Sequence, residues 1–571
     1  MPELPKLPKR RGRIARSCDA CYSRKIKCDA AAPKCDWCSH HRLACTYDRL
    51  SKLGAAVATA APSGREGLVE TFAPAFAHNL QLAGRYLGNI CTFDGTPFFS
   101  KGGREWVYHC TGEIFCPEYL PSELPQSLQP PMAVASDLPL PDLTFLNEEI
   151  RQYLASPLGL FFPVVNRALF ESTVDAAYSQ RYSSTSPGPH SARACIFALM
   201  SLTALSVHGP RGYPLKYSDQ HAREAHRLLP KALEEPVSLD GFQTLLILCL
   251  CAQGLAGDFH TVDQLLSAAA RYACYLKGHI SPAAAWEKPS DSNSHIRRLF
   301  WIVYVCDKGL SMVTGLPPRL EDAHCDLDLT QCLHGDPDPG SDLHTYVQLA
   351  FIQSRIQRDL YSPIALQQPE ANILRTIRDL DHELDMWKRS LKSSNQPTLL
   401  AGGRDPLHNT DVRFSIFHLQ YHHCMVMIHQ TSSRCASWVQ NKNARDPSSS
   451  LAISVTASRS LLQQFVASSL DLGPANLLFS ISYFIQAIIV LFCNVLCNPL
   501  DDDCQGDLDL IGAIPSFLDR QHLGETPRSY ATRLASARKI ILELKRLAQC
   551  AINKANEHIP YLSTQEHLSM Q

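Results

Sequence analysis

An eleven-residue pattern occurs twice near the amino terminus, as CDACYSRKIKC over Cys18–Cys28 and as CDWCSHHRLAC over Cys35–Cys45. Each copy reads Cys-Asp-x-Cys, six residues, Cys, a spacing that suits thiolate ligands of zinc. A disulfide framework would use the same residues in a secreted chain. We expect reduced thiols instead, because the first residues lack the apolar core of a signal peptide. The repeat therefore predicts a small domain that is folded by metal.

The number of sulfurs limits how zinc can be held. One tetrahedral zinc takes four thiolates and leaves two unused, whereas two zincs need eight ligand positions. Six thiolates serve two ions only if two of them bridge, and the symmetry of the repeat selects Cys18 and Cys35. We therefore expect two Zn²⁺ ions, one held by Cys18, Cys21, Cys28 and Cys35 and the other by Cys35, Cys38, Cys45 and Cys18. A single-zinc site of another kind stays open as the alternative.

Charge is distributed unevenly along the chain and within the repeat. Residues 1–50 carry twelve Lys and Arg against five Asp and Glu, which is +7, and the remainder carries 42 against 50, which is −8. Such asymmetry favours a basic arm that binds a polyanion. Only the first copy is strongly basic between its cysteines. Compensation of a negatively charged cluster would make both copies basic, so we expect the first copy to bind nucleic acid.

The basic residues of the first copy suit the major groove, where Lys and Arg bind guanine edges, and those upstream suit phosphates. The upstream run is also typical of a nuclear import signal, with a solvated tail as the alternative. A nuclear location is therefore expected. The candidate DNA contacts are Arg24, Lys25 and Lys27 in the first copy, and Arg11, Arg13 and Arg16 upstream.

The rest of the chain is expected to be helical. Composition changes to an Ala-rich linker after the repeat, an aromatic lead-in occupies about 80–116, and apolar residues then recur at helical spacing. The fold class is therefore mostly α, with a small binuclear zinc cluster domain and a large all-α helical domain. The predicted parts are a basic arm at 1–17, the zinc cluster at 18–48, a linker at 51–80, a helical domain at 142–500, and an acidic loop with a C-terminal helix at 501–571.

Several helices can be placed by their apolar stripes. The segment 294–314 should end at Gly315, which Pro317 and Pro318 follow. Leu477–Leu496 is long enough to span a bilayer, but it contains polar residues and lacks closely flanking basic clusters, so a buried core helix is favoured. The other segments are 192–207, 240–254, 262–276, 371–393, 411–430, 451–469, 477–497 and 527–554.

Two further stretches of the sequence are candidate sites. His418, His422, His423 and His429 lie in one helical pattern without the spacing of a closed metal site, and we assign them no metal. The acidic, leucine-bearing stretch Leu500–Asp519 resembles an activation segment in composition, but a solvated loop between two helices is favoured. No phosphate-binding loop, H-E-x-x-H or G-x-S-x-G motif is found. The chain is therefore expected not to be an enzyme, with a metabolic enzyme carrying a zinc module as the remote alternative.

The cysteine repeat resembles the fungal binuclear zinc cluster, the six-cysteine domain of a large family of transcription factors. The resemblance covers all six cysteines and Pro33, which falls on the proline of the loop between the halves. It implies that Lys25 reads a CGG triplet, with Arg24 and Lys27 at flanking basic positions. The region 142–500 resembles the family's middle homology region, above all in "HIRRLFWIVYVCDKGLSMVTGLPPRLEDAHCDLDL".

This resemblance implies a nuclear, sequence-specific transcription factor of RNA polymerase II genes that binds double-stranded DNA with CGG-type elements. We expect an activator of a metabolic gene set, either a secondary-metabolite cluster or carbon-source catabolism, with a repressor or accessory regulator as the alternative. A small-molecule inducer or a protein co-regulator is a possible partner, and no membrane is expected. Only Leu50, Leu53 and Val57 keep a heptad before Pro62, so we expect a monomer or a dimer formed through the helical domain.

Overall fold

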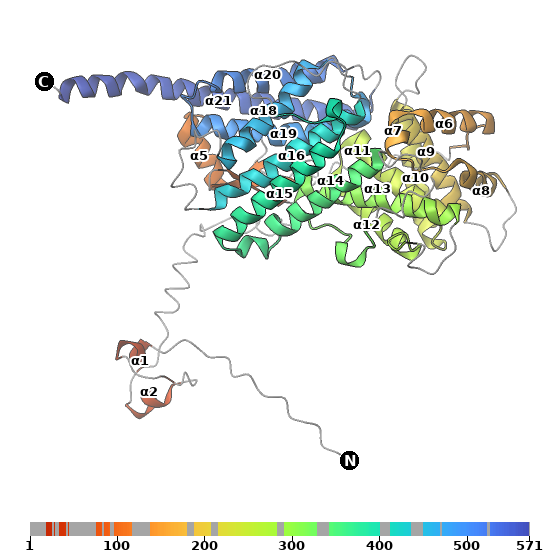
Figure 1. The fold of residues 1–571 in the computed structure, drawn as a ribbon, viewed down its shortest axis with the longest axis horizontal. Helices are drawn as coiled ribbons and strands as arrows, with labels where there is room; N and C mark the ends of the chain where they lie inside the picture. The colour runs from red at the N-terminus through yellow and green to blue at the C-terminus, as the bar shows by residue number, and fades with distance from the viewer. Residues whose placement is uncertain are drawn as a thin grey trace. The chain divides into compact units, whose positions relative to one another are not determined.

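The computed structural model divides into two units, Met1–Pro74 and Ala75–Gln571 (Figure 1). Within the first unit the helices are α1 (Asp19–Ser23) and α2 (Asp36–His40). The second unit holds the strands and the remaining helices. The structure describes residues 19–24, 28, 34–41, 44, 76–82, 85–91, 96–116, 138–179, 188–206, 215–281, 290–327, 342–399, 412–435, 449–468, 471–521 and 526–569.

The second unit is built mainly of helices, as predicted. They are α5 (Lys101–Thr111), α6 (Leu143–Ala155), α7 (Pro157–Phe161), α8 (Arg167–Tyr178), α9 (Pro189–Ser206), α10 (Leu215–Glu234), α11 (Leu239–Ala256), α12 (Phe259–Tyr275), α13 (Asp291–Thr314), α14 (Asp342–Ile356), α15 (Glu370–Ser390), α16 (Val412–Gln430), α18 (Ser450–Ala467), α19 (Gly473–Cys497), α20 (Cys504–Arg520) and α21 (Arg528–Ser569). One π-helical turn, η3 (Gln357–Tyr361), continues α14. Short 3-10 turns lie at Asp322–His324, Ala365–Gln367, Ser393–Asn395 and Thr431–Arg434.

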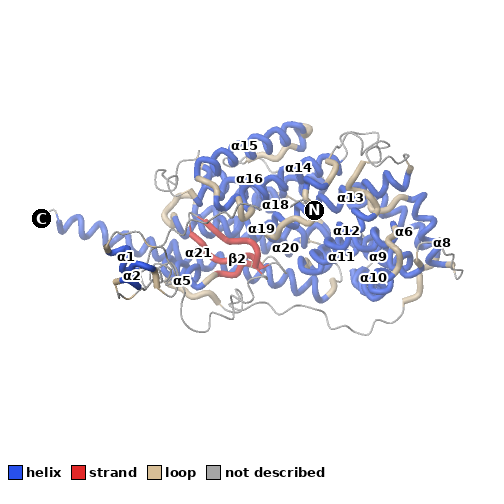
Figure 2. Tube along the Cα trace, turned by 90° about the horizontal axis from the view of Figure 1, so that it is seen from below, coloured by secondary structure: helices blue, strands red, loops and turns tan. Residues whose placement is uncertain are grey.

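A small antiparallel sheet precedes the helices, in the order β1 (Phe76–Leu82), β2 (Arg85–Cys91) and β3 (Pro97–Phe99), and Figure 2 shows it in red. β1 begins inside the stretch that composition assigned to a linker ending at residue 80, so that end of the predicted linker is wrong. Gly88 has a φ of 151°, and a Cβ there would lie 2.0 Å from the Phe98 carbonyl oxygen. Only glycine allows β2 to approach β3 so closely.

The lead-in that contains this sheet packs on the C-terminal helix. α5 lies beside α21, although the two are more than 400 residues apart in the sequence (Figure 1). The Cys116 N–H donates to Glu543 Oε1 at 2.9 Å, and Lys554 Nζ donates to the His109 carbonyl at 2.6 Å. The aromatic lead-in is therefore part of the same folded unit as the helices.

The centre of the second unit is formed by apolar helices, with α19 packed against α11, α18 and α21. Of the helices that the structure describes, α19 is the one long and apolar enough to cross a membrane, and 83% of its most apolar window is buried within the protein. A helix that is apolar on all sides is buried when other helices surround it. The interpretation of 477–496 as a core helix is therefore confirmed.

Buried hydrogen bonds join helix α13 to the loop that follows it. The helix ends at Gly315 as predicted, with a left-handed φ of 73° and its N–H bonded to the Ser311 carbonyl. The fully buried Asp307 carboxylate accepts hydrogen bonds from the backbone N–H groups of Arg319 (2.9 Å) and Leu320 (3.0 Å). Burial raises the pKa of Asp307 to about 6, and these donors together with Lys308 oppose the rise. Through these bonds the loop after Gly315 folds back onto α13, and both segments belong to the motif quoted above.

The acidic loop predicted for Leu500–Asp519 is wrong, because most of this stretch forms α20. Its apolar side chains are buried at helical spacing, including Leu508, Ile511 and Phe517. Arg459 of α18 donates two hydrogen bonds to the Asp507 carboxylate, from Nε at 2.6 Å and from Nη2 at 2.9 Å. The acidic residues on the other face are exposed. The stretch is therefore a packed amphipathic helix rather than a solvated segment.

Candidate metal centre and nucleic-acid interface

Each copy of the cysteine repeat starts a short helix directly after its first cysteine. α1 covers Asp19–Ser23 and α2 covers Asp36–His40, and the two helices are in contact. Cys35 is the N-cap of α2, with extended φ and ψ of −67° and 152°, and its Sγ accepts from the Cys38 N–H at 3.4 Å. Because one helical turn separates the two cysteines of Cys-x-x-Cys, this arrangement brings both sulfurs to one side of α2.

Three thiols meet between the two helices. Cys21, Cys35 and Cys38 have no exposed surface, and their sulfurs all lie within 4.8 Å of one another. The Sγ atoms of Cys21 and Cys35 are 3.7 Å apart. Cys28 is half-buried and packs against the same cluster. Four of the six predicted zinc ligands lie in the described residues, and the structure brings these four together.

The donors fit zinc by chemistry and by distance. Two thiolates on one tetrahedral zinc, each about 2.3 Å from the metal, lie about 3.8 Å apart, which matches the Cys21–Cys35 separation. Zinc here would supply folding energy rather than reactivity, because a domain with so few apolar residues cannot bury a core of its own. Among the described residues, Cys21, Cys28, Cys35 and Cys38 would supply the thiolates.

The predicted DNA contacts are only partly described. Arg24 is exposed at the end of α1, and its guanidinium lies over the Trp37 ring of the second copy, 5.3 Å from the centroid. The half-buried Trp37 also packs against the cysteine cluster and lies 4.4 Å from the His41 ring. Trp37 was not predicted as part of the site, although an aromatic residue between two ligand cysteines was a visible signal. Other predictions lie outside the described residues, namely Cys18, Cys45, Lys25, Lys27, Arg11, Arg13, Arg16 and the heptad at Leu50–Val57.

The histidines of α16 form hydrogen bonds with neighbouring helices and loops. His418 contacts the Asn395 carbonyl and Gln464, each at 2.8 Å, and His429 contacts Asp381 at 3.2 Å. Burial lowers the pKa of His422 to about 3, and His418 and Lys388 add to this effect. All four histidines of this pattern are buried in the helical unit.

Of the fourteen cysteines that the structure describes in the helical unit, seven are buried and four more pack against the core, as expected of small apolar residues. Cys249, Cys251 and Cys493 are buried, and burial raises the pKa of each thiol. A raised pKa keeps them protonated and makes them poor metal ligands. Among the described residues, three or more side chains that could together hold a metal ion meet only at the cysteine cluster of the first unit.

Comparison with known families matches both parts of the chain. Residues 16–53 match the fungal Zn(2)-Cys(6) binuclear cluster domain, and residues 160–389 match the fungal specific transcription factor domain. The chain carries both domains of fungal binuclear zinc-cluster transcription factors. The zinc-cluster domain therefore implies zinc binding, and the cysteine group described above is its visible part.

Relatives of this zinc-cluster protein have regulatory names. An "ABC-transporter-regulating transcription factor" of Aspergillus oryzae is 25% identical over 83% of this chain, and one of Aspergillus fumigatus is 24% identical over the same share. An uncharacterised transcriptional regulatory protein of Schizosaccharomyces pombe is 22% identical over 89% of this chain and 73% of its own length. The chain spans 55% of the length of the two Aspergillus relatives. Domains and names together indicate a transcription regulator rather than an enzyme, as predicted.

Proposed function

We propose that the chain is a nuclear, sequence-specific DNA-binding regulator of RNA polymerase II transcription. The observation that carries the proposal is the cluster of three buried thiols in a unit whose first fifty residues carry a net charge of +7. Two Zn²⁺ ions share the six cysteines through Cys18 and Cys35. The place of Cys35 supports this sharing, since its sulfur approaches Cys21 of the first copy and the backbone of Cys38 in the second.

DNA recognition is assigned to the basic residues around α1. Lys25, flanked by Arg24 and Lys27, reads guanines of a CGG element, while Arg11, Arg13 and Arg16 bind phosphates. The Trp37 ring supports the Arg24 guanidinium through a cation–π contact, which limits the side-chain entropy that Arg24 would lose on binding. Trp37 therefore positions a DNA contact without itself reading a base.

Binding of the full-length chain to CGG-containing and shuffled duplexes tests this assignment. Lys25→Ala should weaken binding to the CGG duplex by about 1–3 kcal/mol and narrow the difference between the duplexes. Arg11→Ala, the matched loss of one positive charge, should weaken binding to both duplexes alike and reduce the salt dependence by about one charge. Equal losses for both variants on both duplexes would contradict a reading role for Lys25.

The helical unit is proposed to set the transcriptional output, as an activator of a metabolic gene set and in response to a small-molecule inducer or a protein co-regulator. The names of the Aspergillus relatives make transporter genes a second candidate set. Genome-wide occupancy separates these sets, because the occupied promoters identify the regulated genes. Replacing residues 1–50 by an unrelated DNA-binding domain separates an activator from a repressor, since only an activator raises expression of a reporter.

The oligomeric state follows from the short heptad. We propose a monomer, or a dimer formed by the helical unit, because so few heptad positions cannot hold a stable parallel coiled coil. Sedimentation of the full-length chain and of a fragment carrying residues 1–90 tests this. A fragment that forms a tight dimer by itself would contradict the proposal.

A further inference from the structure

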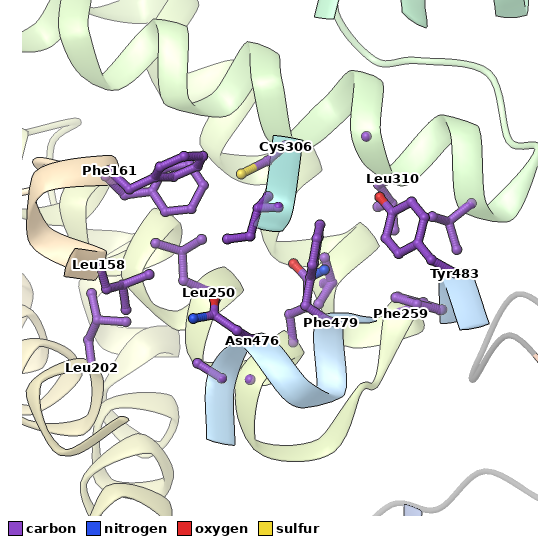
Figure 3. Close-up of a pocket in the computed structure, with 18 residues that line it drawn as sticks. Leu158, Phe161, Leu202, Leu250, Phe259, Cys306, Leu310, Asn476, Phe479 and Tyr483 are labelled. Atoms are coloured by element: carbon purple, nitrogen blue, oxygen red, sulfur yellow. The ribbon is translucent and has the colours of Figure 1, made fainter. Parts of the chain in front are cut away.

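A cavity lies inside the helical unit, between α11 and α12 on one side and α13 and α19 on the other, with α7 and α9 at its end. The centre of a water-sized sphere can occupy about 60 Å³ inside this cavity. A single water needs only about 10–15 Å³ by this measure, so the cavity admits a larger molecule. Figure 3 shows the rings of Phe161, Phe479 and Tyr483 around it.

The cavity wall is apolar and carries no formal charge. None of the residues that line it is Asp, Glu, Lys, Arg or His. Cys306 of α13 also lines it, and burial raises the pKa of this thiol to about 12, so it stays neutral. Desolvating an ion in such a site would cost several kcal/mol, so the wall selects uncharged ligands.

Gly309 opens the cavity in the middle of α13. Glycine within a helix is destabilising relative to alanine. A Cβ placed on Gly309 would nevertheless meet no neighbouring atom within 4 Å, although the residue is buried. Close helix packing does not require glycine at this position. The missing side chain leaves space, and this space belongs to the cavity.

One buried polar group in the wall lacks a full set of partners. The Tyr483 hydroxyl is inaccessible to solvent and makes no hydrogen bond of ordinary geometry. Burial raises its pKa, and the nearby Gln420 amide opposes that rise only weakly. That amide donates instead to the Tyr346 hydroxyl. A buried hydroxyl without a partner is destabilising, and a ligand with an acceptor or donor atom would recover part of the lost stability.

We propose that this cavity binds a small, uncharged, mainly apolar molecule, held between α13 and α19 and carrying one polar atom that pairs with the Tyr483 hydroxyl. Binding at this site needs neither zinc nor DNA. Its use as a regulatory signal rests on the proposed function, because such a ligand would join α13 to the core helix α19. The half-buried Asn476 and Gln253 lie where the cavity wall retains exposed surface, and they mark its entrance.

Two nearly isosteric probes, 4-fluorophenol and 4-fluorotoluene, test the proposal by ¹⁹F NMR titration of the full-length chain. We expect both to bind saturably. Gly309→Met should weaken both by about tenfold or more, because its side chain occupies the ligand's space. Gly506→Met is the matched control, since Gly506 also has no neighbour within 4 Å of an added Cβ but lies exposed on α20. It should leave both affinities unchanged.

Tyr483→Phe isolates the polar contact. It should weaken 4-fluorophenol by about 2- to 10-fold, as expected for one hydrogen bond, and leave 4-fluorotoluene unchanged. Should Gly309→Met fail to fold, Gly309→Ala serves instead, because its single carbon fits without displacing a neighbour. Absence of saturable binding, or wild-type affinity in the folded Gly309 variant, would overturn the proposal. DNA binding by the same preparation is measured in parallel, so a failure of that function is recognised separately.

Discussion

Replacing Arg459 by methionine tests whether α20 is a structural helix held to α18 by a buried ion pair. The Asp507 side chain is 2% exposed and that of Arg459 is 22% exposed, and two hydrogen bonds join them. Removing one partner of such a pair leaves a buried charge without compensation, which costs about 3–5 kcal/mol. The partial exposure of Arg459 places the expected loss near the lower limit, at about 3 kcal/mol. The second carboxylate, Asp503, is 65% exposed and adds little.

The loss converts to a shift of the thermal midpoint. Unfolding entropy is about 2.1 cal/mol/K per residue, so a unit of roughly 500 residues that unfolds cooperatively gains about 1 kcal/mol/K. Arg459→Met should therefore lower the midpoint by about 3 °C in a scan of the full-length chain, followed by far-ultraviolet circular dichroism. Arg459→Met with Asp507→Leu should recover most of the loss, because the uncompensated carboxylate is gone.

Arg538→Met is the matched control for this substitution. Arg538 binds Asp519 of α20 at 2.9 Å, but the two side chains are 50% and 52% exposed. An exposed pair contributes less than about 1 kcal/mol, so its removal should shift the midpoint by less than about 1 °C. Equal shifts for the two arginine variants would refute the reasoning. It would mean that α20 is not anchored through Asp507.

Two further outcomes are expected. Acidification from pH 7.5 to 5 should destabilise the helical unit. The pKa values of buried His422 and His295 are lowered to about 3 and about 4 from 6.5, so the stability that each contributes is present above pH 6.5 and is lost as the pH falls. At pH 5 each histidine has lost about 2 kcal/mol of its contribution to the stability of the fold. Asp307, whose pKa is raised to about 6, adds back about 1 kcal/mol of stability over the same change of pH. A thermal midpoint that rises on acidification would contradict this balance. Chelation with excess EDTA should abolish DNA binding, and the cysteine thiolates freed from zinc should take up protons, while the helical signal persists, because metal affinity is folding energy only for the zinc-cluster domain. DNA binding that survives complete zinc removal would speak against it.

Local pattern predicted much of the fold. Gly315 and the prolines after it marked the end of α13, because helix termini follow from residues close in sequence. The continuous apolar run of α19 indicated a core helix, because a helix that is apolar on all sides is usually surrounded by other helices. The spacing of Cys21, Cys35 and Cys38 predicted a common metal site, since few other functions place thiols at these intervals.

Features that depend on contacts between distant segments were not predicted. The sequence of α20 contains several aspartates and lies between two predicted helices, which suggested a loop, and only its packing against α18 and α21 shows why it is helical. The contact of Arg24 with Trp37 joins the two copies of the repeat and needs their spatial arrangement. Gly309 is an ordinary helical glycine in the sequence, and the space beside it appears only when α11, α13 and α19 are assembled.

The number of zinc ions per chain tests the central claim most directly. Native mass spectrometry of the full-length protein, before and after displacement of metal with a thiol reagent, counts the ions that the thiolates hold. Two zinc ions per chain are predicted, because six cysteines serve two tetrahedral ions only by sharing Cys18 and Cys35. A single zinc per chain, or none, in a preparation that binds the CGG duplex would contradict the account.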